Sequence, residues 1–460
     1  MTAKKSLYTG LILFISLITL FTSTSCTGVG IFAVVAVADK IDEGLLPEGI
    51  SARPVVHIAP DATTDNYYFF ASGPGLWAKN NSGNGLWLPT SLRSGGIEWD
   101  GVQSMAIAGN RIFLALYDVN GDNYQVAIHT LDSFDGTPSF TYFSDQVWSS
   151  DDSGYQTLRL FAPDPAGPVY VDVMNHTGAY ASLDEEDQGF TGSNLYTLDV
   201  SSDEWSDAVL LPHQEYIDGN NGIASARYIT DIADRTAGAG IADDIRMTAT
   251  NHMFNSNGGI LLDGDGNAVT NPDGNPDGSI SIAAGEYTNV SVRGISWIPR
   301  TGVGNGNGVY LMAATFLDND TLPVFASWDG NTWVRVGGTT TDYLTTSFID
   351  VSSETAGRSD GKNLVLAGTS SYIDGSKSRL GSGYNEIDIT SDTLSGWKVN
   401  TSWDDYSFAL NTNYSVSELA EATILGMSIP ENGDFLYAST RNTGIWKIDL
   451  TEDKPSWTRE

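Results

Sequence analysis

The sequence predicts an all-β fold, namely a β-propeller of seven four-stranded blades, and three observations lead to this prediction. The chain has 460 residues, of which 49 are glycine and 11% are aromatic, a composition typical of many strands joined by tight turns. A sequence pattern returns along the chain with a period of about 60 residues, which indicates repeated structural units. The single cysteine makes an internal disulfide impossible, so a domain of this length must be held together by its buried core.

The repeated pattern is clearest in two segments that lie far apart in the sequence. Residues 67–87 contain a β-prone run, a turn, a Gly-aliphatic-Trp triplet, a second turn and a closing Trp, and residues 435–457 repeat this order. Weaker copies lie between these two segments, and each copy is closed by an aromatic residue. The closing aromatic residues are Trp87, Phe140, Trp205, Trp333, Trp397 and Trp457.

The interval between Trp205 and Trp333 is about twice the others, so we expect one divergent unit at about residues 220–288. The chain then contains seven units, each of which reads as four short strands. Such units at this period are typical of a β-propeller. An array of β-sandwiches is the alternative, but it would need longer units with a different turn rhythm.

The chain is expected to divide into a signal at residues 1–25, a tether at residues 26–50 and the propeller at residues 51–460. Within the propeller, residues 213–254 are rich in Ala, Gly and Asp, which predicts long loops on one face. Residues 402–423 predict a second long insertion, in which Ser415 and Glu418 have capping-box spacing for a short helix ending near Ala422. Loops of this length often carry function.

The first residues of the chain have the three parts of a secretory signal. Lys4 and Lys5 give the segment a positive start, and residues 7–21 form an apolar run that is too short to span a membrane comfortably. Residues 22–25 are small and polar, as is typical before a cleavage site. They lead to Cys26, the only cysteine of the chain.

In this position Cys26 resembles the lipobox cysteine of bacterial lipoproteins, which implies that it becomes the acylated first residue of an exported, membrane-anchored chain. Each buried methylene of the lipid would contribute about 0.8 kcal/mol. The match departs from the family at Ser23, where a Leu is usual. An ordinary cleaved signal with an incidental thiol and an uncleaved anchor are the alternatives. Thr27 is not the Asp that retains lipoproteins at the inner membrane of enteric bacteria, so the outer membrane is expected, on its periplasmic or surface face.

The formal net charge of −34 at pH 7 bears on the partners that the protein can bind. Nucleic acids and anionic lipids are recognised by basic surfaces, so neither is expected as a partner. Cationic partners and divalent metal ions remain compatible with this charge. A solvated acidic surface that keeps an exported protein soluble is the simpler explanation.

Two segments place oxygen-bearing side chains at alternate positions, as calcium loops do. One is the short run 118–122. The other, residues 263–278, predicts a calcium site, and calcium is the one cofactor expected. Its candidate ligands are Asp263, Asp265, Asn267, Asp273, Asn275 and Asp277. Neither segment has the Glu that completes an EF-hand, because His129 and Ala284 stand at the twelfth positions, and plain turns are the alternative.

The segments Ser327–Trp333 and Thr451–Trp457 share the order Ser/Thr-x-Asp, a short gap, Ser/Thr and an aromatic residue, and residues 133–140 form a looser copy. This order resembles the Asp-box of sialidase-like propellers, shortened by one residue. We expect the Asp and hydroxyl side chains to hydrogen-bond the turn backbone and the aromatic residue to pack between blades. The Arg-Ile-Pro start of sialidases is missing, so their chemistry is not expected and no catalytic residue is assigned.

These observations favour a binding or scaffold lipoprotein that presents a propeller to a partner protein or a glycan. Lipoprotein propellers of outer-membrane assembly are similar in architecture. Aromatic residues that would serve such a surface are Tyr216, Tyr228, Tyr372 and Tyr406. A hydrolase or lyase that acts on polysaccharide in the central cleft is the alternative, with acidic pairs such as Glu185–Glu186 and Asp243–Asp244 as candidates. The five histidines have no zinc-ligand spacing.

Overall fold

The computed structural model describes residues between Val55 and Glu460, with gaps in the connections, of which the longest are 178–193, 270–289, 352–362 and 401–418. The chain divides into two units, Met1–Glu48 and Gly49–Glu460. The predicted signal at 1–25 and the predicted tether at 26–50 lie outside the described residues, and so does Cys26. The described residues all belong to the second unit.

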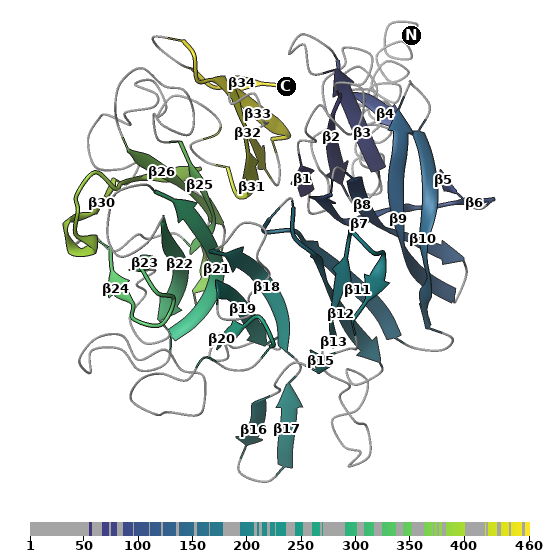
Figure 1. Cartoon of the computed structure of the whole chain (residues 1–460), viewed down its shortest axis with the longest axis horizontal. Coiled ribbons are helices and arrows are strands. Elements are labelled where there is room, and N and C mark those ends of the chain that lie inside the picture. The colour runs from purple at the N-terminus through teal and green to yellow at the C-terminus, as the bar shows by residue number, and fades with distance from the viewer. Residues whose placement is uncertain are drawn as a thin grey trace, which may run out of the picture. The chain divides into compact units, whose positions relative to one another are not determined.

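The described part of this unit contains seven antiparallel sheets, which form the blades of a β-propeller (Figure 1). Blade 1 consists of β1 (Val55–His57), β2 (Tyr67–Ser72), β3 (Gly75–Asn80) and β4 (Leu88–Thr90). Blade 2 consists of β7 (Gly101–Ala108), β8 (Arg111–Asn120), β9 (Asn123–Phe134) and β10 (Pro138–Ser150). Blade 3 consists of β11 (Gly154–Phe161), β12 (Val169–Thr177), β13 (Asn194–Asp199) and an interrupted outer strand, β14 (Glu204–Trp205) and β15 (Val209–Leu210).

The second half of the ring repeats this plan. Blade 4 consists of β18 (Arg227–Asp234), β19 (Ile245–Asn251) and β20 (Ile260–Asp263). Blade 5 consists of β21 (Val290–Pro299), β22 (Gly308–Phe316), β23 (Val324–Ser327) and β24 (Val334–Arg335). Blade 6 consists of β25 (Leu344–Asp350), β26 (Leu364–Ser370), β29 (Tyr384–Asp388) and β30 (Lys398–Asn400), with the 3-10 helix η2 (Leu394–Gly396) before β30. Blade 7 consists of β31 (Ile424–Ser428), β32 (Phe435–Thr440), β33 (Ile445–Asp449) and β34 (Thr458–Arg459).

The sequence-based prediction of a seven-bladed propeller is therefore confirmed. Within each blade the strands pair in chain order, each antiparallel to the one before it. The first strand of each blade also contacts the next blade, and β31 contacts β1, which closes the ring. The predicted closing aromatics of five blades, Trp87, Trp205, Trp333, Trp397 and Trp457, stand in the fourth strand or directly before it.

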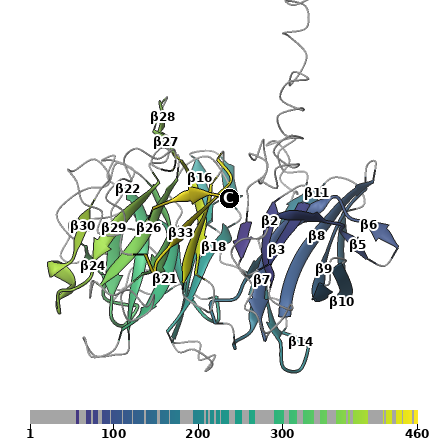
Figure 2. The same ribbon diagram turned by 90° about the horizontal axis from the view of Figure 1, so that it is seen from above.

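In the described part of the chain, three two-stranded hairpins lie outside the blades. They are β5 (Arg93–Ser94) with β6 (Ile97–Glu98), β16 (Gln214–Asp218) with β17 (Asn221–Ser225), and β27 (Tyr372–Asp374) with β28 (Lys377–Arg379). The hairpin β16–β17 extends beyond the blades in Figure 1, and β27–β28 does so in Figure 2.

The structure corrects the expected long loops at residues 213–254, because β16, β17, β18 and β19 occupy most of this range. The alternation of apolar and polar residues in β18 is short and interrupted, so it did not indicate a strand. The Ala, Gly and Asp content of the segment favoured loops instead. The predicted insertion at 402–423 lies largely outside the described residues. At its end the Ala422 N–H donates to the Leu419 carbonyl at 3.0 Å, and Leu419 is fully buried.

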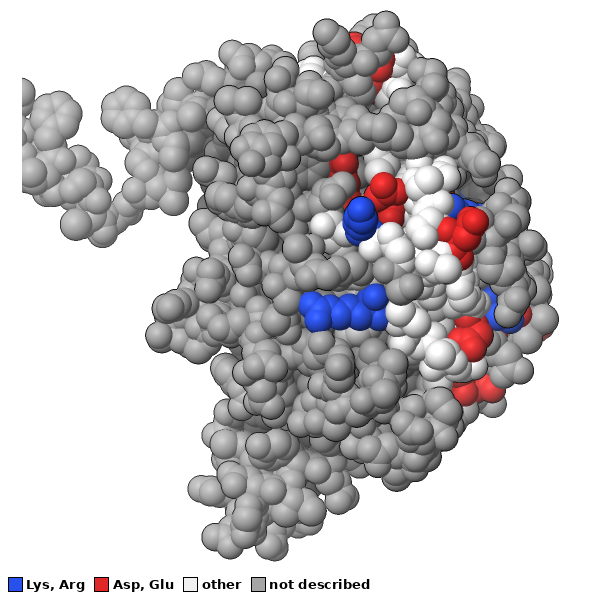
Figure 3. Space-filling view, turned by 90° about the vertical axis from the view of Figure 1, so that its left-hand side faces the viewer, with Lys and Arg blue, Asp and Glu red and all other residues white. Residues whose placement is uncertain are grey.

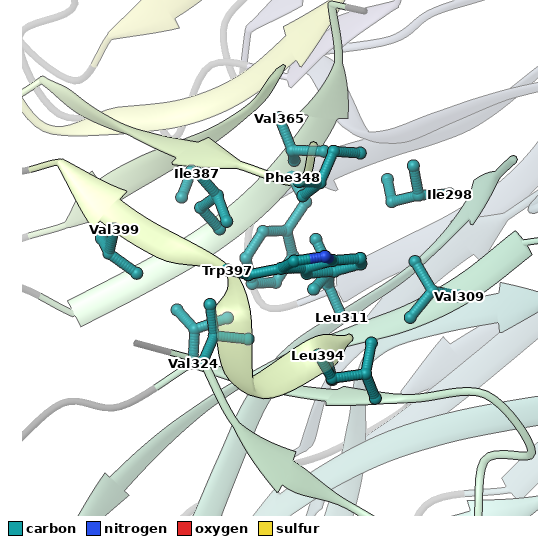
Figure 4. Packing of buried hydrophobic residues seen from close by; sticks show 14 of the residues in the cluster. Ile298, Val309, Leu311, Val324, Phe348, Val365, Ile387, Leu394, Trp397 and Val399 are labelled. Carbon is teal, nitrogen blue, oxygen red and sulfur yellow. The ribbon is translucent and has the colours of Figure 1, made fainter. Parts of the chain in front are cut away.

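The described core consists of six apolar clusters, and each of them spans two neighbouring blades. In the cluster between blades 5 and 6, the fully buried Trp397 packs among Leu311, Phe348 and Ile387 (Figure 4). Aromatic side chains of this size contribute the most apolar area to a core. The seam between blades 7 and 1 differs from these six, because a buried ionic contact crosses it.

Candidate functional site

The first strands of the blades share an irregularity that the sequence does not reveal. In five blades the pairing of the first strand with the second shifts by one residue, which is the signature of a β-bulge. The residues left out of register are Gln103, Thr230, Arg293, Thr346 and Leu425. Bulges redirect side chains and often lie next to functional sites. The innermost strands are therefore the elements expected to carry functional side chains.

Polar side chains of blade 2 hold the backbone of blade 3. Gln103 Oε1 accepts a hydrogen bond from the Leu158 N–H at 2.8 Å, and Ser104 Oγ accepts one from the Leu160 N–H at 3.0 Å. Both acceptors lie at the bulge of β7, and both donors lie on β11. The bulge thus places two side chains where they accept hydrogen bonds from N–H groups of β11, the edge strand of the next blade.

Blade 3 holds blade 4 through two charged residues. Arg159 and Asp172 are direct cross-strand neighbours on β11 and β12. Arg159 Nη1 donates to the Ile229 carbonyl at 3.1 Å, and Asp172 Oδ2 accepts from the Ile229 N–H at 2.9 Å. The fully buried Asp172 and its neighbour together satisfy both polar groups of one residue in the next blade.

Blade 4 continues the chain of contacts through Asp231, which follows the bulge of β18. Asp231 Oδ2 accepts from the Ile295 N–H of blade 5 at 3.1 Å, and Oδ1 accepts from the Ile232 N–H at 3.0 Å. Burial raises the pKa of Asp231 to about 7, although these two hydrogen bonds favour the carboxylate. The pKa of Asp231 therefore lies in the range of a group that can act as a general acid at neutral pH.

The turn at Ser327–Trp333 makes the local contacts that its sequence predicts. Asp329 Oδ1 accepts from the Asn331 and Thr332 N–H groups at 2.9 and 2.7 Å, and Ser327 Oγ accepts from the Gly330 N–H at 2.9 Å. Burial favours a higher pKa for Asp329, but these hydrogen bonds outweigh it and hold the pKa below its usual value. The nearly buried Trp333 packs between blades 4 and 5.

Arg246 of blade 4 fixes this turn from the neighbouring blade. Its Nε donates to the Gly330 carbonyl at 3.1 Å and its Nη2 donates to Asn331 Oδ1 at 3.0 Å. Arg111 makes the equivalent contact from blade 2 to blade 3, where it donates to the Val200 carbonyl at 2.7 Å. These arginines tie neighbouring blades together, each at a different seam.

A sialidase-type site would need three arginines that converge on one carboxylate, and the described arginines of blades 2, 3 and 4 do not converge in this way. Arg111, Arg159 and Arg246 lie in blades 2, 3 and 4, and each contacts the backbone of the following blade. Asp244, one of the candidate acids, forms an ion pair with Arg235 and accepts a hydrogen bond from Tyr310 through its carbonyl. The candidate acids at 184–186 and 243 lie outside the described residues.

Two of the six candidate calcium ligands lie in the described part of the chain. Asp263 Oδ1 accepts from the Asp265 N–H at 3.0 Å, which closes a turn after the third strand of blade 4. Asp199, Asp388 and Asp449 make the same contact with the residue two positions later in blades 3, 6 and 7. This recurrence identifies the Asp263 contact as part of the turn geometry of the blades.

The other candidate ligands, Asn267, Asp273, Asn275 and Asp277, lie outside the described residues. Within the described part of the chain, no three His, Cys, Asp or Glu residues come together in a way that could hold a metal ion. The run at 118–122 is the end of a hairpin, where Gln125 Nε2 donates to Asp118 Oδ2 at 3.2 Å. The calcium site at 263–278 stays a prediction.

Strand direction decides which connections share a face of the propeller. Because strands alternate in direction, the link between the second and third strands and the link from the fourth strand to the next blade leave from the same face. We call this the insertion face and define it by the starts of the first strands, such as Val55, Gly101 and Ile424. The hairpins β5–β6 and β16–β17 belong to links between blades, and β27–β28 belongs to a link between second and third strands. All three hairpins therefore lie on the insertion face.

Two of the aromatic residues predicted to serve a binding surface fall on these hairpins, Tyr216 on β16 and Tyr372 on β27. Tyr228 lies on β18, and Tyr406 lies outside the described residues. A signal for this pairing was present but missed in the sequence, because the tetrapeptide Tyr-Ile-Asp-Gly occurs at 216–219 and again at 372–375. Four residues are too few to stand out before their structural positions are known.

The described surface over blades 5 and 6 shows positive and negative side chains side by side among uncharged residues (Figure 3). Among the described residues, no helix has the length and apolar character needed to cross a membrane.

Comparisons with known proteins identify no family for this chain. No family model and no curated protein matches the sequence. Similar solved structures include dihydro-heme d1 dehydrogenase NirN in complex with DHE, with 11% identity, a TM-score of 0.42, and coverage of 89% of this chain and 67% of that one. The complex of KlAtg21 with the coiled coil of AgAtg16 has 8% identity, a TM-score of 0.41 and coverage of 89% and 98%. YjhT has 12% identity, a TM-score of 0.35 and coverage of 77% and 99%.

Proposed function

We propose that this chain is an exported, lipid-anchored binding protein that presents the insertion face of its propeller to a partner protein or a glycan. The observation that carries this proposal is the concentration of added structure on one face. Three hairpins that take no part in the blades all lie on the insertion face. Loops and insertions held by a rigid frame are the usual place for recognition.

The charged residues of the blade seams support the same proposal. The side chains of Arg159, Asp172 and Arg246 form hydrogen bonds with backbone groups of the next blade. Such contacts rigidify a frame, and a rigid frame lowers the entropy lost when the loops bind a partner. These three charged residues thus serve the framework, which supports a role of the insertion face in recognition.

A crosslinking experiment tests which face binds. A photo-reactive amino acid is placed at Arg93, whose side chain is 70% exposed on β5–β6 of the insertion face. The matched control position is Glu452, which is exposed in the turn between β33 and β34 on the opposite face. Adducts in intact cells are expected from position 93 and not from position 452. Adducts from position 452 alone, or from neither position, would contradict the proposal.

The anchor is tested separately through Cys26. Mass spectrometry of the mature N-terminus should show an acylated cysteine, and Cys26→Ser should move the protein from the membrane fraction to the soluble fraction. An unmodified Cys26 in the mature protein would remove the lipid from the proposal. Fractionation of inner and outer membranes tests the expected outer-membrane location in the same samples.

A polysaccharide hydrolase or lyase is the second candidate, and Asp231 is the observation that favours it. Its pKa of about 7 suits a group that gives and takes protons at neutral pH. If the protein depolymerises a polysaccharide, Asp231→Asn should lower the rate by at least about 100-fold while the melting temperature shows that the variant is folded. Equal activity in the variant would remove Asp231 from this role.

A further inference from the structure

The outer strand of blade 2 is much longer than the outer strands of the other blades. β10 has 13 residues, whereas β4, β14, β24, β30 and β34 have two or three each. β10 forms one end of its sheet, and in the described part of the chain no strand pairs with its outer edge. Short outer strands protect a sheet from pairing with other chains, and blade 2 lacks this protection.

The pairing with β9 divides the edge of β10 into two runs. Residues 138–142 and residues 147–150 pair with β9, and the four residues between them stand opposite Ile128 alone. A bulge of this kind interrupts regular pairing along an edge. The run 147–150 is the one on the insertion face, because β10 ends there before the link to blade 3. About half of its backbone N–H and C=O groups point away from β9, where a further strand could pair with them.

Blade 2 also extends past its own inner strand at this place. β7 begins at Gly101, opposite Tyr117, but the pairing of β8 with β9 continues to Asn120 and Asn123. The run 147–150 pairs with the outer side of this extension. β5, in the link before blade 2, comes near β10 without pairing with it. The run is therefore the free edge of a three-stranded extension on the insertion face (Figure 1).

The sequence around this edge is strongly acidic. Between Arg111 and Arg159 the chain contains no Glu, Lys or Arg, and its charged side chains are those of Asp118, Asp122, Asp132, Asp135, Asp145, Asp151 and Asp152. Three of these aspartates, at positions 145, 151 and 152, flank the run 147–150 in the chain. Such a segment attracts a basic partner. It repels a second copy of this chain, whose net charge is −34.

We propose that the run 147–150 of β10 binds an extended segment of a partner protein that is rich in Lys and Arg, and that this segment adds to blade 2 as a further strand. The inference rests on the proposed binding function and specifies its partner as a protein. Backbone hydrogen bonds along the edge hold the segment, and the surrounding aspartates select a basic one. A glycan does not present N–H and C=O groups at the spacing of a strand.

Hydrogen exchange of the full exported chain without its signal tests whether this edge binds. The probe is an eight-residue peptide of alternating Lys and Val, which is basic and extended. At low salt it should slow amide exchange at residues 147–150 by about 10-fold or more, with no change at β30. Two control peptides should have no effect there. One has Glu in place of Lys, and the other is fully N-methylated, so it keeps its charge but has no backbone N–H groups to donate.

A charge variant tests the preference for a basic segment. Asp145→Asn, Asp151→Asn and Asp152→Asn together should weaken binding of the Lys/Val peptide about 10-fold. The matched control combines Glu204→Gln, Asp392→Asn and Glu452→Gln. It removes the same charge at three exposed residues of blades 3, 6 and 7, and it should bind like the unchanged protein. Equal melting temperatures of both triple variants show that the blades are intact.

Several results would overturn the inference. They are unchanged exchange at residues 147–150, equal slowing at the outer strands of other blades, an equal effect of either control peptide, and equal binding by the two triple variants. A dimer in which these amides are protected without peptide would make a second copy the occupant and would also overturn it. Crosslinks from position 93 with unchanged exchange at 147–150 would leave the binding function standing, so the two failures are distinguishable.

Discussion

At the scale of single residues, burial governs the ionisable groups of this domain more than neighbouring charges do. Burial lowers the pKa of His129 to about 4 and raises the pKa of Asp231 to about 7. His129 lies on β9 with no exposed surface, and its ring meets the Trp99 ring edge-on at 4.9 Å. At neutral pH His129 is therefore uncharged, and Asp231 carries a proton far more often than an exposed Asp does.

His129 predicts how acid destabilises the protein. The unfolded chain binds a proton at His129 below about pH 6.5, whereas the folded chain does so only near pH 4. Stability from this residue is fully present above pH 6.5 and is lost as the pH falls toward 4, by about 3 kcal/mol in all. Denaturant unfolding from pH 7 to 4 should show this loss in the unchanged protein and not in His129→Phe. Parallel pH profiles for the two proteins would contradict the prediction.

At the scale of structural elements, turns rather than strands carry the residues with special backbone demands. Gly330 has a φ of +73°, and a Cβ atom there would lie 2.9 Å from Arg246 Nε. Gly96 also has a positive φ, at +83°, but a Cβ atom would meet nothing within 4 Å. A side chain at position 96 would therefore strain only the backbone, whereas a side chain at position 330 would also displace Arg246.

Substitution of these two glycines tests the role of the Arg246 contact. Gly96→Ala should destabilise by about 1 kcal/mol, because only the left-handed backbone is strained. Gly330→Ala should cost about 2–3 kcal/mol, because Arg246 must also move from its hydrogen bonds. Thermal unfolding of both variants measures the difference. If both substitutions cost the same, Arg246 adjusts without loss and the turn is less tightly fixed than inferred.

The segment 263–278 predicts a second result at this scale. If it binds calcium, saturating Ca²⁺ should raise the melting temperature over that in chelator, by about 2.7 kcal/mol of stability at 100 times the Kd. Asp273→Asn combined with Asp277→Asn should abolish the difference, since two charged ligands are lost. Asp118→Asn serves as the control and should keep it. An identical melt with calcium and with chelator would remove the metal from this segment.

The elements that sequence could predict are those fixed by local pattern. The closing tryptophans, such as Trp397, marked the fourth strands correctly because an apolar residue at that point must be buried in a seam. Buried polar groups could not be predicted in this way. Asp172 resembles any surface Asp in the sequence, and its partner Ile229 is 57 residues away in the next blade. The contact exists only because the ring brings their strands together.

At the scale of the whole molecule, the closing seam of the ring differs from the other six. Lys79 of blade 1 is buried and forms an ion pair with Glu460 of blade 7, while Lys447 donates to the same carboxylate at 2.8 Å. The rings of Tyr68 and Tyr437 meet across the seam at 5.6 Å. Burial lowers the pKa of Lys79, although Glu460 opposes this change. Among the described residues, an ion pair that is shielded from water thus spans the seam between blades 7 and 1, and no strand of one of these blades pairs with the sheet of the other.

Removing one partner of a buried ion pair leaves the other charge buried and uncompensated, and this predicts where the ring opens first. Glu460→Gln leaves the Lys79 charge buried without its partner and should cost about 3–5 kcal/mol. Lys79→Met combined with Glu460→Gln should recover much of this loss, because the buried Lys79 charge is then removed together with its partner. Arg93→Ala, which breaks the exposed pair with Glu98, should cost less than about 0.5 kcal/mol and is the control. Hydrogen exchange in Glu460→Gln should rise first in β1–β4 and β31–β34, because these strands flank the opened seam. A uniform rise over all blades would show that the ring unfolds as one unit and that the seam is not its weak point.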